Sequence, residues 1–353
     1  MKLTWPKAIS DGRMPHVEVV VPCHNYGHYL PGCIDSIVNQ PGVTTTVTIV
    51  DDTSTDDSAA VAERLAERYR QVRLIRNETN LGAWRTFNVG LRQADSDYVV
   101  LISADDLLAP GALGRATALM ENNPTVGLVY GHAQKFASQP VLKRPMPTTS
   151  WTTWRGDRWI GMQLSRSWSN IASPEAVVRT RVHHEVGYYD PGLAHTADVE
   201  MWLRLAAASD VGHINGVDQA YYRRQQVSHS ARFSMYQDID ERWSAYSQFL
   251  TNWSDSDSSA KYRPIVRRRL SRSALFLLLQ QLDHDDVDPE TEAVLELAAR
   301  IDPDVVTTDL WSDVQARVQH KSPAGLAGSV RTAARALAHR TRWHSWYRWR
   351  YFG

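Results

Sequence analysis

The chain has 353 residues, with 39 basic and 39 acidic side chains and therefore no formal net charge. This length suits one large domain or two smaller ones, and an apolar content of 43% is that of a globular protein rather than a disordered or fibrous one. A neutral chain is poorly suited to bulk electrostatic capture of nucleic acid, so we expect no nucleic-acid partner. The two cysteines, Cys23 and Cys33, exclude a disulfide framework and a cysteine zinc site.

The N-terminus lacks the apolar run of a signal peptide, and the longest apolar stretch, residues 274–279, is too short to cross a bilayer. We therefore expect a cytoplasmic protein. The abundance of Arg and Ala is typical of a GC-rich bacterial genome.

The first 130 residues alternate between apolar strands and segments with helical spacing of apolar residues. Strands are expected at residues 16–22, 46–50, 72–75, 98–102 and 126–130. Helices are expected at residues 30–38, 61–69, 83–93 and 112–121. This alternation predicts an α/β, Rossmann-like fold whose central sheet is mainly parallel and covered on both faces. Ligands bind such sheets at the carboxyl ends of the strands.

The later part of the chain is less regular. Residues 138–159 are rich in Pro, Thr and Trp, which indicates a long loop over the site. Strands are expected at 171–179 and 214–224 and a helix over 199–206, and the chain reads as helical from residue 237 onward. His183 and His184 are expected to be exposed helix residues.

Three common motifs are absent from the sequence. The first strand is not followed by three spaced glycines, and the chain contains neither a phosphate-binding loop of the G-x-x-x-x-G-K-S/T kind nor a Gly-x-Ser-x-Gly elbow. These absences argue against dinucleotide-binding enzymes, P-loop nucleotidases and α/β-hydrolases.

Two of the expected strands end in acidic residues. Asp51 and Asp52 follow the second strand, and Asp105 and Asp106 follow the fourth. Carboxylates at the carboxyl edge of a sheet suit a hard divalent cation that also binds a diphosphate. Acids of this kind also cap helices, which is the interpretation we adopt for the 56–57 pair directly before a helix.

Four segments together resemble a known family. They are VVVPCHNYGHYLPGCIDSI (19–37), VDDTSTDDS (50–58), NLGAWRTFNVGL (80–91) with LISADDLLAPGAL (101–113), and HTADVEMWLRLA (195–206). In order and spacing they resemble a family 2 glycosyltransferase with the A-type nucleotide-sugar fold. The resemblance runs from Val17 to about Ser230 and does not extend to the C-terminal third.

The resemblance implies a domain organisation. Residues 1–15 would be an N-terminal extension and residues 16–236 the catalytic domain, with a nucleotide-binding half at 16–132 and an acceptor half at 133–236. Residues 237–353 would form a helical region that ends in a basic tail rich in Trp and Arg.

The resemblance also implies a pocket for the donor nucleotide. Asp51 would accept a hydrogen bond from the imide N–H of uracil or thymine, and Asp52 would lie behind it or near the ribose. Arg85 would lie near the diphosphate, with a solvated helix residue as the alternative. The residues implied on the nucleotide side are Pro22, His24, Asn25, Asp51, Asp52, Asn80, Gly82, Arg85, Asn88, Ser103 and Ala104.

A metal site is implied as well, for Mg²⁺ or Mn²⁺. The metal motif of the family is Asp-x-Asp, and this chain has Ser103 at its first position, so Asp105 aligns with the acid that holds the metal. A Tyr-Arg-x-His segment often supplies another ligand, but Gln225 takes the histidine position here, which leaves His229 as the alternative ligand. Arg223 or Arg224 would neutralise the departing diphosphate.

Asp198, which precedes a Trp-Leu-Arg sequence, is implied as the general base. The alternative is a first-turn acid stabilised by the helix dipole, and both descriptions can hold at once. The residues implied on the acceptor or sugar side are Asp106, Trp168, Asn170 and Glu200.

The implied reaction is inversion by a single displacement, from a UDP- or TDP-sugar to a hydroxyl or amine of a glycan, a lipid-linked acceptor or a small molecule. Two alternatives remain at this point. A catalytically degenerate scaffold would account for Ser103 and Gln225, and a nucleotidyltransferase shares the sheet and the acids but usually has a Gly-rich loop that this chain lacks.

The C-terminal tail also leaves alternatives open. Its alternating Arg and Trp residues suit peripheral contact with an anionic membrane surface on the inner face. The other interpretation, which we favour, pairs the tail with the acidic block at 283–296, within one molecule or across a homodimer.

Overall fold

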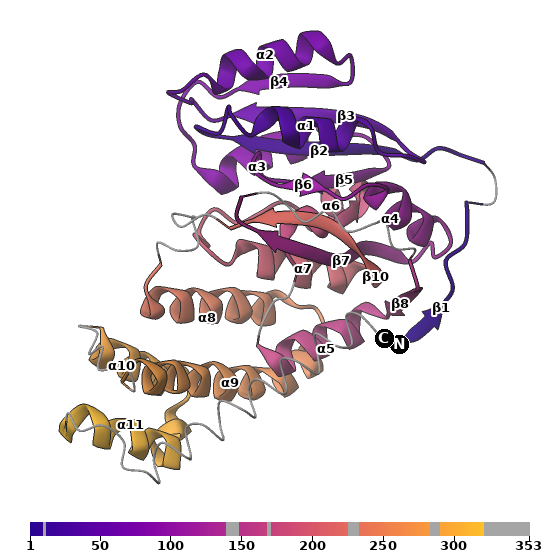
Figure 1. Cartoon of the computed structure of the whole chain (residues 1–353). Helices are drawn as coiled ribbons and strands as arrows, with labels where there is room; N and C mark the ends of the chain where they lie inside the picture. The colour runs from indigo at the N-terminus through magenta and orange to yellow at the C-terminus, as the bar shows by residue number, and fades with distance from the viewer. Residues whose placement is uncertain (10–11, 139–147, 168–170, 225–232, 283–289, 321–353) are drawn as a thin grey trace. The chain divides into compact units, whose positions relative to one another are not determined.

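The computed structural model describes residues 1–9, 12–138, 148–167, 171–224, 233–282 and 290–320 (Figure 1). These residues fall into two compact units. The first comprises the described residues of Met1–Ile160 and Asn170–Gln226, and the second those of Gly161–Ser169 and Val227–Trp349.

A mixed sheet forms the centre of the first unit. Its strands within the described residues are β1 (Lys2–Thr4), β2 (His16–Cys23), β3 (Thr44–Asp51), β4 (Val72–Arg76), β5 (Tyr98–Leu101), β6 (Leu107–Leu108), β7 (Val126–Phe136), β8 (Ser150–Trp154), β9 (Val177–Arg179) and β10 (Asp210–Arg223). They lie in the order β1-β8-β10-β7-β9-β5-β2-β3-β4, with β6 paired to β10. The order confirms the α/β class.

The strand directions explain where loops gather. Strands β5, β2, β3 and β4 are parallel, and β7 is parallel to β10. Strand β9 runs antiparallel to both β5 and β7, so β7 and β10 point the same way as β5. The sheet is therefore mixed where a mainly parallel one was expected, yet six strands still end at one edge.

Helices cover both faces of this sheet. They are α1 (Leu30–Val38), α2 (Ser58–Arg68), α3 (Ala83–Arg92), α4 (Ala112–Glu121), the residues up to Ile160 of α5 (Gly156–Arg166), α6 (Thr180–Val186) and α7 (Ala197–Ala208). Alternate residues of β2 face opposite sides. Val19 and Val21 share a hydrophobic core with Ile34 of α1, whereas Val20 faces Gly90 of α3 on the other side.

The stretch expected to be a long loop contains regular structure. Strand β8 pairs with β1 and β10, and α5 follows it, with Trp151 and Trp159 buried. The aromatic and β-branched sequence Ser-Trp-Thr-Thr-Trp favours a strand, but the Pro-rich residues before it hid this preference. The strand expected at 171–179 is a short 3₁₀ turn, η1 (Ser173–Glu175), followed by β9.

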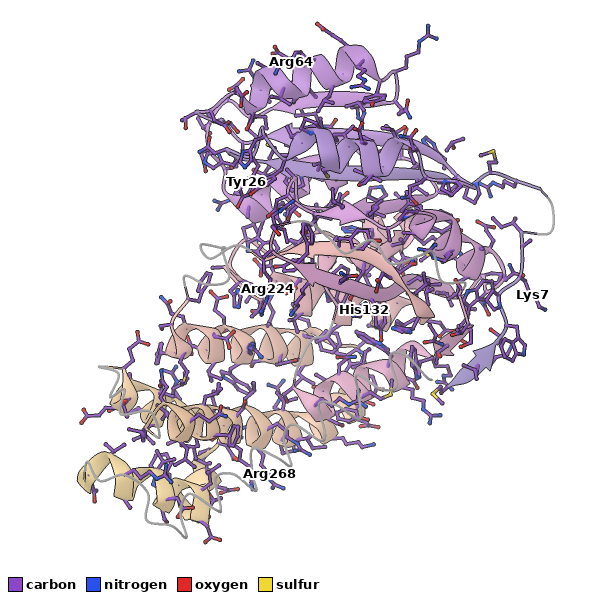
Figure 2. The ribbon with its side chains drawn as sticks, in the orientation of Figure 1. Lys7, Tyr26, Arg64, His132, Arg224 and Arg268 are labelled. Carbon is purple, nitrogen blue, oxygen red and sulfur yellow. The ribbon has the colours of Figure 1, made fainter. Side chains whose placement is uncertain are left out.

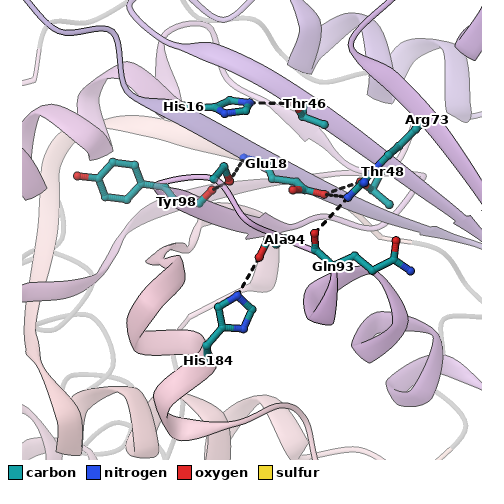
Figure 3. A network of polar contacts seen from close by, with 10 residues as sticks. His16, Glu18, Thr46, Thr48, Arg73, Gln93, Ala94, Tyr98 and His184 are labelled. Carbon is teal, nitrogen blue, oxygen red and sulfur yellow. Dashed lines mark hydrogen bonds and ion pairs between the residues drawn. The ribbon is translucent and has the colours of Figure 1, made fainter.

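Figure 3 shows a polar network across β2, β3 and β4 on the face that α3 covers. Glu18 is buried, and its carboxylate accepts hydrogen bonds from Thr48 Oγ1 at 2.6 Å and from the Arg73 guanidinium at 2.6 Å. Arg73 also donates to Thr48 Oγ1 and to the carbonyl of Gln93 at the end of α3. The network satisfies a buried charge and fastens α3 to the sheet.

The second unit is helical. Its main elements are α8 (Met235–Asn252), α9 (Ser256–Leu282), α10 (Thr291–Ile301), η3 (Pro303–Thr307) and α11 (Asp309–His320). Helix α9 packs against α8, α10 and α11, and Ser271 Oγ donates to the carbonyl of Ala298 at 2.8 Å. No helix in the described residues is long and apolar enough to cross a membrane. The basic tail and residues 283–289 of the acidic block lie outside the described residues.

The packing of α3 on the sheet predicts opposite effects for two Gly→Ala changes. A Cβ at Gly90 would lie 2.4 Å from Val20 Cγ1, so Gly90→Ala should destabilise the fold by about 1–3 kcal/mol. A Cβ at Gly32 of α1 would meet only Leu107 Cδ2 at 3.8 Å, so Gly32→Ala should stabilise by about 0.5 kcal/mol through helix propensity. Thermal unfolding measures both changes, and an equal rise in Tm for the two variants would contradict this packing.

His183 is buried in α6, contrary to the expectation of an exposed residue, and burial lowers its pKa from 6.5 to about 4. The folded state therefore binds a proton at His183 less readily than the unfolded chain does. As a result, the free energy of unfolding falls as the pH drops from 6.5 towards 4. The loss should reach roughly 3 kcal/mol. In urea unfolding, His183→Gln should show a smaller loss over this range than the wild type, whereas His184→Gln at the exposed neighbour should behave like the wild type.

Candidate functional site

Polar side chains gather at the edge where the six strands end. Strand β2 ends at Cys23, β3 at Asp51, β5 at Leu101 and β10 at Arg223. Figure 2 labels Tyr26, in the loop after β2, and Arg224, directly after β10. The loops after these strands carry most of the residues singled out from the sequence.

Asp52 is a structural residue of this edge. Its carboxylate accepts hydrogen bonds from the backbone N–H groups of Leu81 at 2.9 Å and Gly82 at 3.0 Å and from Asn77 Nδ2 at 2.7 Å. Gly82 is the N-cap of α3 and has φ +77°, a backbone conformation that favours glycine. Asp52 therefore lies behind the loop and fixes where α3 begins.

Asp51 differs from its neighbour. The residue is 2% exposed, and one oxygen accepts from the backbone N–H of Ser54 at 3.3 Å. The other oxygen, Oδ1, is buried with no hydrogen-bond partner within the described residues. A buried carboxylate oxygen that lacks a donor is costly, so this atom is suited to a donor that a ligand brings.

His24 and Asn80 lie beside Asp52. His24 Nδ1 contacts the Asp52 carbonyl at 2.9 Å, and a carbonyl only accepts, so this nitrogen carries the proton. The amide of Asn80 lies within 3.4 Å of the same carbonyl, and its oxygen accepts from the Gly82 N–H. Both exposed side chains thus lie against the backbone of Asp52, at the edge where the strands end.

Asn25 organises the loop after β3. With φ +60° its side-chain oxygen accepts from the backbone N–H groups of Thr55 at 2.7 Å and Asp56 at 3.3 Å. Thr53 in the same loop has φ +58°, a conformation that costs a β-branched residue about 1–3 kcal/mol. Its hydroxyl donates to the carbonyl of Asn77, which helps to hold this strained conformation.

Asp105 and Asp106 bring two carboxylates together after β5. Asp106 is buried, its Oδ1 accepts from the backbone N–H of Arg223 at 2.8 Å, and its Oδ2 is buried with no partner within the described residues. Burial, and then the charge of Asp105, raises the pKa of Asp106 well above its usual range. A positive charge bound here would relieve both effects.

Arg223 holds the loop that carries these carboxylates. Its guanidinium donates to the carbonyls of Asp105 and Ser138 and lies 4.5 Å from the centre of the Tyr29 ring and 4.4 Å from that of Phe136. With these partners it fixes the loop backbone, whereas the sequence suggested contact with the diphosphate. Arg224 is the exposed neighbour.

Tyr222 lies within electrostatic range of these two carboxylates and of Asp198. Burial first, and then the charges of Asp106, Asp105 and Asp198, raise the pKa of Tyr222 to about 12. Asp198 lies in the first turn of α7, half-buried, and its Oδ1 also accepts from the N–H of Val199 at 2.7 Å. Asp198, expected as the base, Asp105, expected at the metal, and Asp106, expected on the acceptor side, thus all act electrostatically on one phenol.

Two placements differ from expectation. Glu200 is buried, and both its oxygens accept from Arg204 Nε, at 2.7 and 2.8 Å, so it is a structural residue rather than a group on the acceptor side. Ala104 is fully buried in the hydrophobic core. Pro22 is buried within β2, and Arg85 is exposed in the first turn of α3.

Several expected residues lie outside the described part of the chain. They are Trp168, Asn170, Gln225 and His229. Within the described residues, no group of three or more His, Cys, Asp or Glu side chains is placed to hold a metal ion. Asp105 and the unpartnered oxygen of Asp106 nevertheless form a hard oxygen donor set of the kind that suits Mg²⁺ or Mn²⁺ together with phosphate oxygens.

Sequence reasoning missed the residues that hold the site together. Asn88 was expected on the nucleotide side, but it is buried and forms hydrogen bonds with the backbone of Tyr189. The rings of Tyr29 and Phe136 come from distant segments that no motif connects. The sequence offered one indication for Asn88, because a polar amide stands there on the buried face of the predicted helix and needs hydrogen-bond partners.

Comparison with known sequences gives a consistent result. Residues 18–184 match the model described as glycosyl transferase family 2. The chain is 31% identical over 209 residues to an uncharacterised protein of Mycobacterium tuberculosis, covering 56% of this chain and 64% of that one. It is 32% identical over 92 residues to the glycosyltransferase GlyG of Streptococcus pneumoniae, covering 26% and 31%. The match thus spans less than two thirds of each of these relatives.

Solved structures share the fold. Staphylococcus aureus TarS 1–349 in complex with UDP-GlcNAc superposes with a TM-score of 0.62 at 16% identity, covering 87% of this chain and 92% of that one. Mannosyltransferase PcManGT from Pyrobaculum calidifontis, in complex with GDP-Man and Mn²⁺, superposes with a TM-score of 0.51 at 17% identity, covering 93% and 90%. These structures show that the chain has the A-type fold, and residues 18–184 are similar in sequence to glycosyl transferase family 2.

Proposed function

We propose that the protein is an inverting glycosyltransferase that moves a sugar from a UDP- or TDP-sugar to a hydroxyl or amine acceptor. The observation that carries this proposal is that Asp105, Asp106 and Asp198 all act electrostatically on Tyr222, at the strand edge where Asp51 has a buried oxygen without a partner in the described residues. The match of residues 18–184 to glycosyl transferase family 2 supports it. The donor site falls in residues 16–132 and the acceptor side in residues 133–236.

Asp51 suits a donor whose base carries an imide N–H. Uracil and thymine carry an imide N–H, and a carboxylate oxygen is a strong acceptor for such a donor. Asp51 Oδ1 lacks a partner and lies one residue from Asp52, whose oxygens are fully used by the protein. The exposed side chains of His24 and Asn80 are placed to border the same nucleotide.

Asp198 acts as the general base of the proposed reaction. Its carboxylate takes the proton of the acceptor as the acceptor oxygen or nitrogen bonds to the anomeric carbon, while the bond to the diphosphate breaks and its electron pair leaves with the diphosphate. Asp105, with Asp106 beside it, would hold Mg²⁺ or Mn²⁺, which stabilises charge on a leaving diphosphate when bound. Arg223 keeps the loop of these carboxylates in place.

Asp198→Asn tests this function. The measured quantity is the rate of nucleoside diphosphate release from the best donor in a panel of UDP-, TDP- and GDP-sugars. General-base assistance is typically worth ~10²–10⁴-fold, so Asp198→Asn should lower this rate by that factor. Nucleotide binding by thermal shift should stay near that of the wild type. Glu185→Gln, an exposed acid on α6, serves as the control and should retain full turnover.

The outcomes separate the alternatives. Near-native turnover by Asp198→Asn would contradict the assigned base. A wild-type protein that binds nucleotides but cleaves no donor, with or without Mn²⁺, would instead favour the degenerate scaffold.

A further inference from the structure

Helix α3 is hydrogen-bonded at its beginning to the nucleotide side of the site. Asp52 accepts from the N–H groups of Leu81 and Gly82, and the carbonyl of Gly82 accepts from the N–H of Thr86 in the first turn. Gly90 seats the same helix directly on β2. The position of α3 is therefore set by the loop that carries Asp51 and Asp52.

Asn88 connects this helix to a segment a hundred residues further along the chain. Its Nδ2 donates to the carbonyl of Tyr189 at 2.7 Å, and its Oδ1 accepts from the N–H of Tyr189 at 3.0 Å. Both residues are buried. A two-way bond of this kind needs a donor and an acceptor on one short side chain, which only Asn provides at this length.

Trp84 makes a second connection, one turn earlier on α3. Its ring stacks on that of Tyr189 with centroids 5.2 Å apart and an interplanar angle of 26°, and its Nε1 donates to the carbonyl of Ala194 at 2.9 Å. Phe87 packs edge-on against both rings. Ala194 lies only four residues before Asp198.

Helix α7 holds the residues that directly precede Tyr189. Arg204, paired with the buried Glu200 on α7, donates to the carbonyls of Val186 and Tyr188. The charge of Asp198 acts on the Tyr189 phenol, whose pKa is raised above its usual range mainly by burial. Asp198, in the first turn of α7, therefore directly follows a segment that forms hydrogen bonds with both α3 and α7.

We infer that Asn88 and Trp84 are positioning residues that fix Asp198 relative to the nucleotide loop, with α3 as the rigid connection between them. This inference rests on the proposed function, because it takes Asp198 as the base. A small displacement of a catalytic group has a large effect on rate, on the order of 10²-fold for about 1 Å. Loss of the connection should therefore lower kcat while the donor site, which is held by Asp52, keeps its affinity.

The test compares variants with the UDP-, TDP- or GDP-sugar that the wild-type protein cleaves fastest. Asn88→Leu should lower kcat about 10²-fold and leave KM within about threefold. Trp84→Phe keeps the ring contact but loses the bond to Ala194, so kcat should fall about tenfold, the effect of one neutral hydrogen bond. Gln93→Ala, at the exposed end of α3, is the control and should retain wild-type kcat.

Two further measurements exclude a merely structural effect. Calorimetric titration with the corresponding nucleoside diphosphate counts the binding-competent sites. The stoichiometry of both variants should stay at the wild-type value. If Asn88→Leu folds poorly, Trp84→Phe still provides this measurement. In an Asp198→Asn background, Asn88→Leu and Trp84→Phe should lower the residual rate by less than twofold, because residues that act through one another are not additive.

The inference would be overturned by unchanged kcat in both variants, by loss of nucleotide sites in proportion to kcat, or by full additivity with Asp198→Asn. Failure of the wild-type protein to cleave any donor is a different result, and it would contradict the proposed function itself.

Discussion

The common direction of β4, β3, β2, β5, β7 and β10 is the constraint on which the site depends. Parallel strands buried on both faces leave polar side chains to the loops at their ends, and these strands share one carboxyl edge. The short antiparallel strand β9 is inserted between β5 and β7 without reversing that direction. Carboxylates from segments far apart in the sequence therefore lie at one edge.

The acidic residues fall into two groups, those whose carboxylate oxygens all have hydrogen-bond partners in the protein and those with an oxygen that lacks one. Asp52 and Glu200 are buried and fully paired, so they hold loops and helices in place. Asp51 and Asp106 each keep a buried oxygen that no described group donates to. Because such atoms are costly in a folded protein, their retention at one edge is more readily explained by ligand binding than by stability.

The sequence predicted elements better than it predicted roles. Apolar periodicity located most strands and helices between residues 16 and 132, because each local pattern there agrees with its tertiary burial. It missed β8 and α5, where Pro-rich neighbours obscured the local preference. Asp51 and Asp52 are identical in type and adjacent, so only the tertiary structure reveals that both oxygens of Asp52 have partners whereas Oδ1 of Asp51 has none in the described residues. The bonds of Asn88 span about a hundred residues, and no local pattern encodes them.

A thermal-shift panel would test whether this edge binds a nucleotide through Asp51. UDP, TDP, GDP, CDP and ADP would be compared with and without Mn²⁺, for the wild type and for Asp51→Ala. A ligand specific for the folded state raises Tm with its concentration relative to Kd. We expect a shift with UDP or TDP that is larger with Mn²⁺ and is lost in Asp51→Ala. Equal shifts for all five nucleotides, or a UDP shift that persists in Asp51→Ala, would contradict it.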